Sequence, residues 1–272
     1  MIPENAVSAA EFLIALRSEG RVATSPPDGL EPGTVADGYR IQEAFLAGWP
    51  HPQTGWKIGA TAAAVQERFG LSEPFCGPFF GPNVYASPAR PVAGDFPHLC
   101  LESEFAFRFA RALPAREATY ARAEIAEAID AVIPAIELVG PRFDSLLFGH
   151  AAMAIADCGM NAGFVLGEPV LDWQTYDLPN HPVVLRLDGE VVAEGCGANV
   201  LGDPMAVLEW TVNHLSERGI GVGEGMVVST GTMTGLVHVL PDQDAVADFG
   251  SLGQVAVTFT GAAHRQNVSK AG

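Results

Sequence analysis

The chain has 272 residues, of which 48% are hydrophobic, and this is enough for one large domain or for a small domain beside a larger one. Its formal net charge of −17 argues against nucleic acid or an anionic membrane surface as a partner, because both are bound through basic patches. Four scattered cysteines, no signal-peptide pattern at the amino terminus and no apolar run of about 20 residues predict a cytoplasmic protein.

The amino-terminal part is expected to be mainly helical. A capping box that begins at Ser8 predicts a helix over residues 8–18. A Pro- and Gly-rich loop over residues 21–33 follows, and Thr34 is expected to cap a second helix over residues 35–47.

The next segment contains a notable lysine. Residues 55–59, Gly-Trp-Lys-Ile-Gly, predict a short strand, and Thr61 is expected to cap a helix over residues 62–69. Lys57 is the only lysine before Lys270, so lysine is not a common surface residue in this protein. Two interpretations remain open: a partly desolvated lysine that meets a carboxylate or moves a proton, and an exposed strand lysine with a packed stem.

Residues 71–97 are rich in glycine, proline and phenylalanine, and we expect an irregular connection there. The same composition makes this segment the best candidate for a domain boundary. The chain is therefore divided into an amino-terminal portion, residues 1–80, and a larger domain, residues 81–272.

Two apolar strands carry three acids. Residues 98–110 predict a strand in which Glu102 and Glu104 point to the same face, about 7 Å apart. A second predicted strand, residues 131–139, carries the single acid Glu137. Two carboxylates on one apolar face repel each other and are costly to desolvate, so a cation between them is expected.

Two interpretations of these acids compete. In the first, Glu102 and Glu104 line a solvated sheet face and Glu137 pairs with Arg142. In the second, the three acids hold a metal. Three hard oxygen ligands without histidine or cysteine suit Mg²⁺ or Mn²⁺ better than zinc.

A further acid, Asp157, stands in the apolar segment 149–160, ahead of a predicted strand over residues 161–167. Asp157 is either a buried partner for a cation or a turn residue beside Cys158 and Gly159.

The last hundred residues are expected to be mainly β. Residues 183–187 and 190–196 flank an Asp-Gly turn and predict a hairpin. A helix is expected to start at Asp203-Pro204, and a final strand is expected over residues 255–260, followed by a polar tail.

Residues 226–235 predict a strand that ends in small hydroxyl residues and glycines, among them Thr230 and Gly231. Such a loop can present backbone N–H groups to an anion, and an ordinary strand-to-loop turn is the alternative.

Five short motifs follow one another along the chain. They are Gly-Trp-Lys-Ile-Gly at 55–59, Leu-Glu-Ser-Glu-Phe at 101–105, Pro-Ala-Ile-Glu-Leu-Val at 134–139, Ala-Asp at 156–157 leading to 163–167, and Ser-Thr-Gly at 229–231. The ordered set resembles the fumarylacetoacetate hydrolase superfamily, in its branch of 2-keto-4-pentenoate hydratases and 4-oxalocrotonate decarboxylases. The resemblance implies an α+β fold, a mixed β-roll that carries the site with a small amino-terminal α/β portion.

The resemblance also implies a site. It places a divalent metal, Mg²⁺ or Mn²⁺, on Glu102, Glu104 and Glu137, and Lys57 at the substrate. The implied substrate is a small anionic 2-keto acid or 2-hydroxy-dienoate, and the metal would act on it as a Lewis acid.

Further site residues are expected beside these. Asp157 is expected to orient Lys57 or a water molecule, and Thr230 and Gly231 to hold the distal end of the substrate. Phe75 marks a departure, because the hydratases often carry an aspartate at the matching place in this loop. Poor hydration or another substrate would follow if that acid delivers water.

The predicted activity is that of a metal-dependent lyase, in the first place a 2-keto-4-pentenoate hydratase. A 4-oxalocrotonate decarboxylase, an acylpyruvate-type C–C hydrolase and a non-catalytic partner subunit are the alternatives. The hydrolase branch often uses a His–Glu pair near the amino-terminal part, and none is evident here. The expected assembly is a homo-oligomer, which could associate with a related pathway enzyme.

Overall fold

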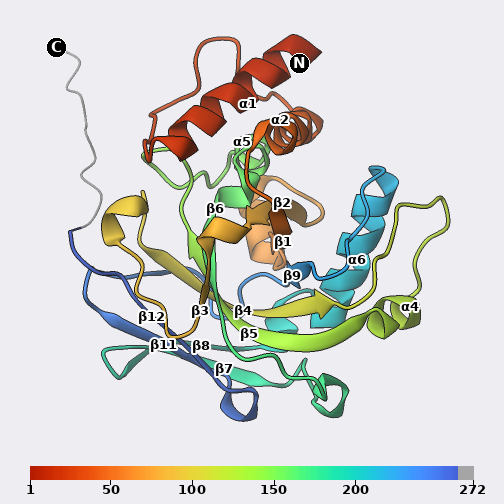
Figure 1. Ribbon diagram of the computed structural model, residues 1–272, viewed down its shortest axis with the longest axis vertical. Helices are drawn as coiled ribbons and strands as arrows, with labels where there is room; N and C mark the ends of the chain where they lie inside the picture. Colours follow the sequence, from red (N-terminus) through yellow and green to blue (C-terminus); the bar gives the residue numbers. More distant parts are fainter. Residues whose placement is uncertain (263–272) are drawn as a thin grey trace.

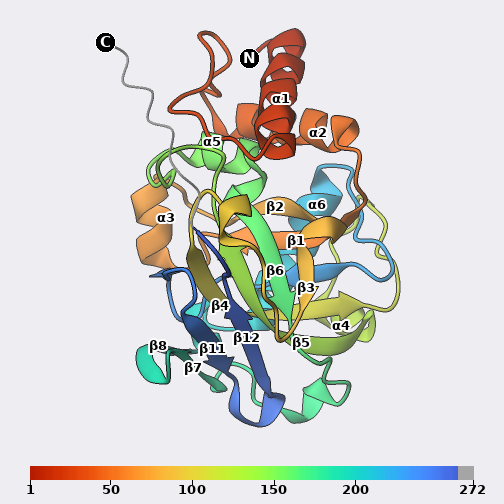
Figure 2. The same cartoon turned by 60° about the vertical axis from the view of Figure 1, so that its left-hand side comes forward.

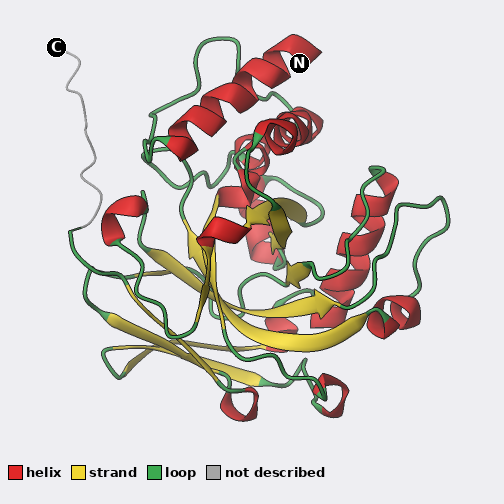
Figure 3. Cartoon of the chain, in the orientation of Figure 1, coloured by secondary structure: helices red, strands yellow, loops and turns green. Residues whose placement is uncertain are grey.

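Two β-sheets form the body of the molecule (Figures 1 and 3). The computed structural model describes residues 1–262, so most of the predicted polar tail lies outside it. The larger sheet has eight strands in the order β2-β1-β9-β4-β5-β6-β3, with β10 paired to β4. Its strands are β1 (Gln53–Gly59), β2 (Phe75–Phe80), β3 (Val84–Ala86), β4 (Cys100–Phe109), β5 (Ile129–Val139), β6 (Asn161–Leu166), β9 (Val227–Ser229) and β10 (Val237–His238).

The smaller sheet has four antiparallel strands in the order β12-β11-β7-β8 and packs at the opposite end from the amino terminus (Figure 1). The predicted hairpin and the predicted final strand are both confirmed in it. Asp188 and Gly189 both take positive φ at the hairpin turn, as an Asp-Gly turn of this kind requires. The strands are β7 (Pro182–Leu187), β8 (Glu190–Cys196), β11 (Asp244–Asp248) and β12 (Gln254–Thr258).

Six α-helices surround the sheets, and none of those within residues 1–262 is long and apolar enough to cross a membrane. The first two helices lie together over one end of the molecule with α5 beneath them (Figure 1), whereas α3 lies at the left-hand side of Figure 2. The helices are α1 (Pro3–Ser18), α2 (Val35–Gly48), α3 (Ala63–Phe69), α4 (Arg122–Glu127), α5 (Ala151–Ala156) and α6 (Pro204–Glu217).

The first residues of α1, α2 and α3 can be compared with the predicted helix caps. Thr34 caps α2 as predicted, because its hydroxyl accepts a hydrogen bond of 3.1 Å from the amide of Asp37. The capping box at Ser8 is wrong, since α1 already begins at Pro3, whose fixed φ suits a first helical turn. Thr61 is also wrong as a cap: Ala62 holds that position and makes no side-chain bond.

The segment 71–97 is more regular than predicted, because it contains β2 and β3. Proline is tolerated in β2 since this strand lies at the edge of the large sheet, where one side needs no ladder hydrogen bond. Gly77 has a further role: a Cβ there would lie 2.2 Å from the carbonyl oxygen of Cys158. The glycine in this segment therefore reflects close backbone packing within a strand, and not the loop that the composition predicted.

The sheet order also joins distant parts of the chain. β1 pairs in parallel with β9, and β9 pairs antiparallel with β4, so strands from both ends of the sequence meet at the centre. The division of the chain at residue 80 stays a prediction.

Candidate metal centre and active site

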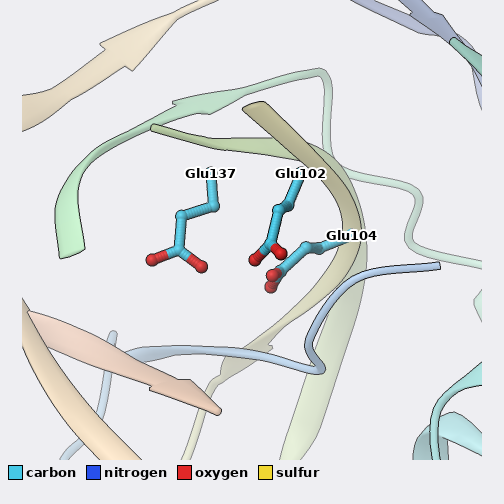
Figure 4. A group of neighbouring side chains, drawn as sticks. All are labelled: Glu102, Glu104 and Glu137. Carbon is cyan, nitrogen blue, oxygen red and sulfur yellow. The ribbon is translucent and has the colours of Figure 1, made fainter. Parts of the chain in front are cut away.

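Three glutamate side chains converge on one face of β4 and β5 (Figure 4). Glu102 lies directly opposite Glu137 in the antiparallel register, and Glu104 follows two residues along β4. One carboxylate oxygen of each lies within 4.8 Å of the others. Like charges opposite each other destabilise a sheet, so this arrangement requires a compensating cation.

The donor set fits a hard divalent cation. Glu104 and Glu137 are fully buried, and Glu104 Oε1 lacks a hydrogen-bond donor within the described chain. Opposite ligands of Mg²⁺ lie roughly 4.2 Å apart, at roughly 2.1 Å from the ion, so small side-chain shifts suffice. The interpretation of a solvated sheet face, made for Glu102 and Glu104, is wrong for Glu104.

Lys57 supplies one positive charge to the cluster. Its side chain is 3% exposed, and Nζ lies 3.1 Å from Glu137 Oε2. Nζ also donates a 3.1 Å hydrogen bond to the carbonyl oxygen of Gly159. The interpretation of an exposed strand lysine is wrong, and so is the pairing of Glu137 with Arg142.

The carboxylates of the cluster carry more negative charge than Lys57 balances. Burial raises the pKa of Glu102 to about 7, against the attraction of Lys57 and with the repulsion of Glu137. Burial, followed by the charge of Glu137, raises the pKa of Glu104 well above its usual range. Burial would lower the pKa of Lys57, but the charges of the three carboxylates outweigh it and raise that pKa. Three carboxylates face one ammonium, and a dication would balance them.

Hydrogen bonds from neighbouring residues hold two of the three carboxylates, those of Glu104 and Glu137. Asn161, the first residue of β6, donates a 2.9 Å hydrogen bond from Nδ2 to Glu137 Oε1. The amide of Gly231 donates a 3.1 Å hydrogen bond to Glu104 Oε2. Both oxygens of Glu137 thus contact protein donors, Asn161 and Lys57, whereas Glu104 keeps Oε1 without a hydrogen bond within residues 1–262.

Asp157 does not contact Lys57 through any bond within the described residues. Its Oδ2 accepts a 2.5 Å hydrogen bond from the backbone amide of Arg142, and Arg142 and Arg17 are the cations beside it. Both sequence interpretations of this acid apply, since Asp157 is a buried partner of a cation and also flanks the turn η3 (Cys158–Met160). That turn carries the Gly159 carbonyl to which Lys57 bonds.

The loop after β9 uses Thr230 and Gly231 for contacts within the protein, whereas we expected them to hold the distal end of the substrate. The hydroxyl of Thr230 bonds to the carbonyl oxygen of Phe105 at 3.1 Å, so it is engaged by the backbone. Gly231 bonds to Glu104, as described above, and does not line the cavity that opens beside Lys57 and Glu102. Thr232, two residues further along the chain, does line it, and its buried Oγ1 has no hydrogen-bond partner.

Substitution of Gly231 tests how closely the loop after β9 packs behind Glu104. Gly231 has φ +84°, and a Cβ would lie 2.3 Å from Thr61 Oγ1 and 2.9 Å from the carbonyl oxygen of Ile58. Gly231→Ala is expected to lower the free energy of unfolding by about 2 kcal/mol or more, measured with denaturant in EDTA. Gly225→Ala is the matched control, because Gly225 has φ +79° with no atom within 4 Å, and its expected cost is about 1 kcal/mol. Equal costs would contradict the packing argument.

A cavity of about 170 Å³ opens beside Lys57 and Glu102. Its walls are mostly apolar, and Phe75 forms part of them with its ring centroid 5.9 Å from Lys57 Nζ. Arg68 is the one arginine that lines it, with its guanidinium carbon 3.7 Å above the ring of Phe148. The cavity therefore offers Glu102 of the triad, one lysine, one arginine and an apolar wall to a ligand.

Sequence reasoning missed Thr232, Arg68 and Phe148. Thr232 stands two residues beyond the chosen threonine, and only the path of the loop decides which hydroxyl faces the cavity. Arg68 lies in the last turn of α3, where a basic residue commonly interacts with helix carbonyls. No local signal distinguishes these residues from ordinary surface residues.

The fold defines a structural class, the mixed β-roll that this chain shares with a putative fumarylacetoacetate hydrolase family protein from Yersinia pestis, which has a TM-score of 0.56 and 13% identity over 77% of this chain and 94% of that one. A 4-oxalocrotonate decarboxylase from Pseudomonas putida G7, solved with magnesium and adipate, has a TM-score of 0.87 to this chain and 24% sequence identity. That likeness covers 95% of this chain and 98% of the decarboxylase, and it confirms the predicted fold class.

Sequence comparison is more specific. A 2-keto-4-pentenoate hydratase from Burkholderia vietnamiensis is 31% identical over 209 residues, which span 76% of this chain and 78% of that protein. A 4-oxalocrotonate decarboxylase from Pseudomonas putida is 28% identical over 231 residues, 83% of this chain and 86% of the relative. No family model matches the chain. The chain belongs to the family of 2-keto-4-pentenoate hydratases and 4-oxalocrotonate decarboxylases, as the sequence motifs predicted.

Proposed function

We propose that the protein is a divalent-metal-dependent lyase that acts on a 2-hydroxy-dienoate or 2-keto acid, in the first place as a 2-keto-4-pentenoate hydratase. The observation that carries this proposal is the buried carboxylate triad with Lys57 beside it, at the edge of an apolar cavity. The named relatives that span most of the chain support the same reaction class.

Glu102, Glu104 and Glu137 would hold the metal, Mg²⁺ or Mn²⁺. When bound, the ion supplies a Lewis acid next to the cavity. Lys57 is the residue placed to move a proton, because its Nζ is buried at the cavity wall and contacts Glu137. Phe75 and the other apolar walls exclude water from the carbon chain of the substrate, and Thr232 Oγ1 can bind a water or a substrate oxygen.

Metal removal tests the reaction class. Protein treated with EDTA is expected to lose at least about 99% of its turnover of 2-hydroxypenta-2,4-dienoate, and addition of Mg²⁺ or Mn²⁺ is expected to restore this turnover. The decrease in dienoate absorbance measures the turnover. Zn²⁺ serves as the comparison metal. Full turnover in excess EDTA would refute a metal-dependent reaction. Mass spectrometry of the products formed from 2-hydroxypenta-2,4-dienoate and, separately, from 4-oxalocrotonate distinguishes added water from released CO₂.

One observation favours the decarboxylase alternative. Arg68 is exposed at the cavity, is held by the ring of Phe148 and has no ion-pair partner within residues 1–262. A guanidinium in this place suits a second carboxylate at the distal end of the substrate, which 4-oxalocrotonate carries and 2-hydroxypenta-2,4-dienoate lacks.

Arg68→Met separates the two reactions. With 4-oxalocrotonate, the variant is expected to raise KM about tenfold or more, because a charge-assisted contact to the second carboxylate is lost. With 2-hydroxypenta-2,4-dienoate, KM and kcat should change less than about twofold. Arg90→Met, at another exposed arginine, is the control. Equal effects on both substrates would show that Arg68 does not bind a second carboxylate of the substrate.

The remaining alternatives have less support. An acylpyruvate-type hydrolase would yield pyruvate and a carboxylic acid, and the product assay above detects both. A non-catalytic partner subunit is expected to lack the acids or the lysine, whereas Glu102, Glu104, Glu137 and Lys57 are all assembled here.

Assembly and location are also part of the proposal. A homo-oligomer, and association with a related pathway enzyme, remain our expectation. The four cysteines are free and three of them are buried, which supports a reducing compartment such as the cytoplasm.

A further inference from the structure

A second cavity, of about 690 Å³, lies away from the one described above and is lined by two arginines. Arg17 stands in the last turn of α1, and Arg142 follows the end of β5. Asn83, His51 and Tyr85 contribute polar groups to its walls. None of these five residues lines the cavity beside Lys57.

Arg142 is the unusual member of this cavity. Its side chain is 3% exposed, and its guanidinium makes no hydrogen bond and no ion pair within residues 1–262. Its Nε is buried without an acceptor. A buried guanidinium has five donors and no acceptor, and its burial is costly unless an anion or ordered water receives them.

Arg17 stands beside Arg142 and is held rigidly. Its guanidinium carbon lies 5.7 to 5.8 Å from three ring centroids, those of Phe45, Trp49 and Phe80. One of its nitrogens donates to the carbonyl oxygen of Asn161, but its Nε is buried without a partner. An arginine fixed among aromatic rings loses little entropy when it binds an anion.

The charges around the two arginines leave a positive excess. Asp157 is the buried acid that interacts with both, so one carboxylate faces two guanidinium groups. Two other acids line the cavity, and both are exposed: Glu19 pairs with Arg21 at 2.5 Å, and Asp95 faces solvent. Neither neutralises a buried guanidinium effectively, because solvent screens exposed charges.

We propose that Arg17 and Arg142 form a binding site for a small oxyanion, a carboxylate or a phosphate, distinct from the carboxylate triad. The planar guanidinium groups match the geometry of such an anion, and one bound monoanion balances the excess charge. The site is linked to the triad by one residue, because Asn161 accepts from Arg17 through its backbone and donates to Glu137 through its side chain.

Calorimetric titration of the full-length protein in EDTA tests this site with inorganic phosphate, sulfate and succinate as probes. Saturable binding of at least one anion at about one per chain is expected, and Arg17→Gln and Arg142→Gln should each weaken it at least tenfold. The strongest of the three probes identifies the class of anion. Because Arg142 is buried, Arg142→Gln can fail to fold; Arg17→Gln then carries the test alone.

Two controls separate this site from the rest of the surface. Arg90→Gln removes an exposed arginine, and Arg68→Gln removes the exposed arginine of the cavity beside Lys57; both should keep the wild-type affinity for the anion. Absence of saturable binding for all three probes, unchanged affinity in Arg17→Gln, or loss of binding in Arg68→Gln would each overturn the proposal.

Discussion

Glu104→Gln is expected to abolish divalent-cation binding and to reduce turnover at least about a thousandfold. Glu104 is fully buried, and its Oε1 has no hydrogen-bond partner, so the substitution removes a ligand oxygen without changing the volume of the side chain. Calorimetry with Mg²⁺ or Mn²⁺ measures the first effect, and the dienoate assay measures the second.

The same variant has a second expected effect that a general folding defect cannot produce. In EDTA, Glu104→Gln should match or exceed the wild-type melting temperature, because the substitution removes one of three repelling buried carboxylates. Glu127→Gln, at an exposed acid outside the site, is the control and should leave binding, turnover and melting temperature unchanged. Wild-type metal affinity in Glu104→Gln would refute the proposed metal centre.

Lys57→Met is expected to reduce turnover about a thousandfold while Mg²⁺ binding persists. The methionine keeps the apolar stem of the side chain but removes the ammonium that contacts Glu137 at 3.1 Å. In EDTA the variant should be less stable than wild type, because the buried carboxylates lose their one ammonium neighbour. Denaturant unfolding in EDTA and calorimetry with Mg²⁺ check the two statements.

Lys57→Arg distinguishes the two roles of this charge. Arginine restores a cation but does not release its proton at neutral pH, so turnover should stay low if Lys57 moves a proton. Recovery of most activity in Lys57→Arg would show that charge alone is required. More than a tenth of wild-type turnover in Lys57→Met would contradict a catalytic role altogether.

Two members of the triad could be predicted together because their spacing is local. Side chains two apart on a strand share a face, and this rule brings Glu102 and Glu104 together before any fold is known. Glu137 required a further step, the pairing of β4 with β5, and the family motifs supplied it. The register that places Glu102 opposite Glu137 is a tertiary fact.

Contacts made across long separations could not be predicted. Lys57 could be marked as unusual, but its pairing with Glu137 joins residues 80 positions apart through a curved sheet. Asp157 was noticed as an isolated acid, whereas its neighbours Arg17 and Arg142 reach it from other elements. The strand β2 was missed for a related reason, since its glycine serves close packing against Cys158 and not a turn.

The hydrogen bond from Gly231 to Glu104 has a consequence for biosynthesis. β9 separates β1 from β4 in the sheet, so the ammonium and the three acids reach their places only after the ribosome has released about 230 residues. A nascent chain therefore carries the acids long before it can hold them in this arrangement. Any ion at this centre is loaded into a nearly completed protein, and supply of the metal during translation should not speed its early folding.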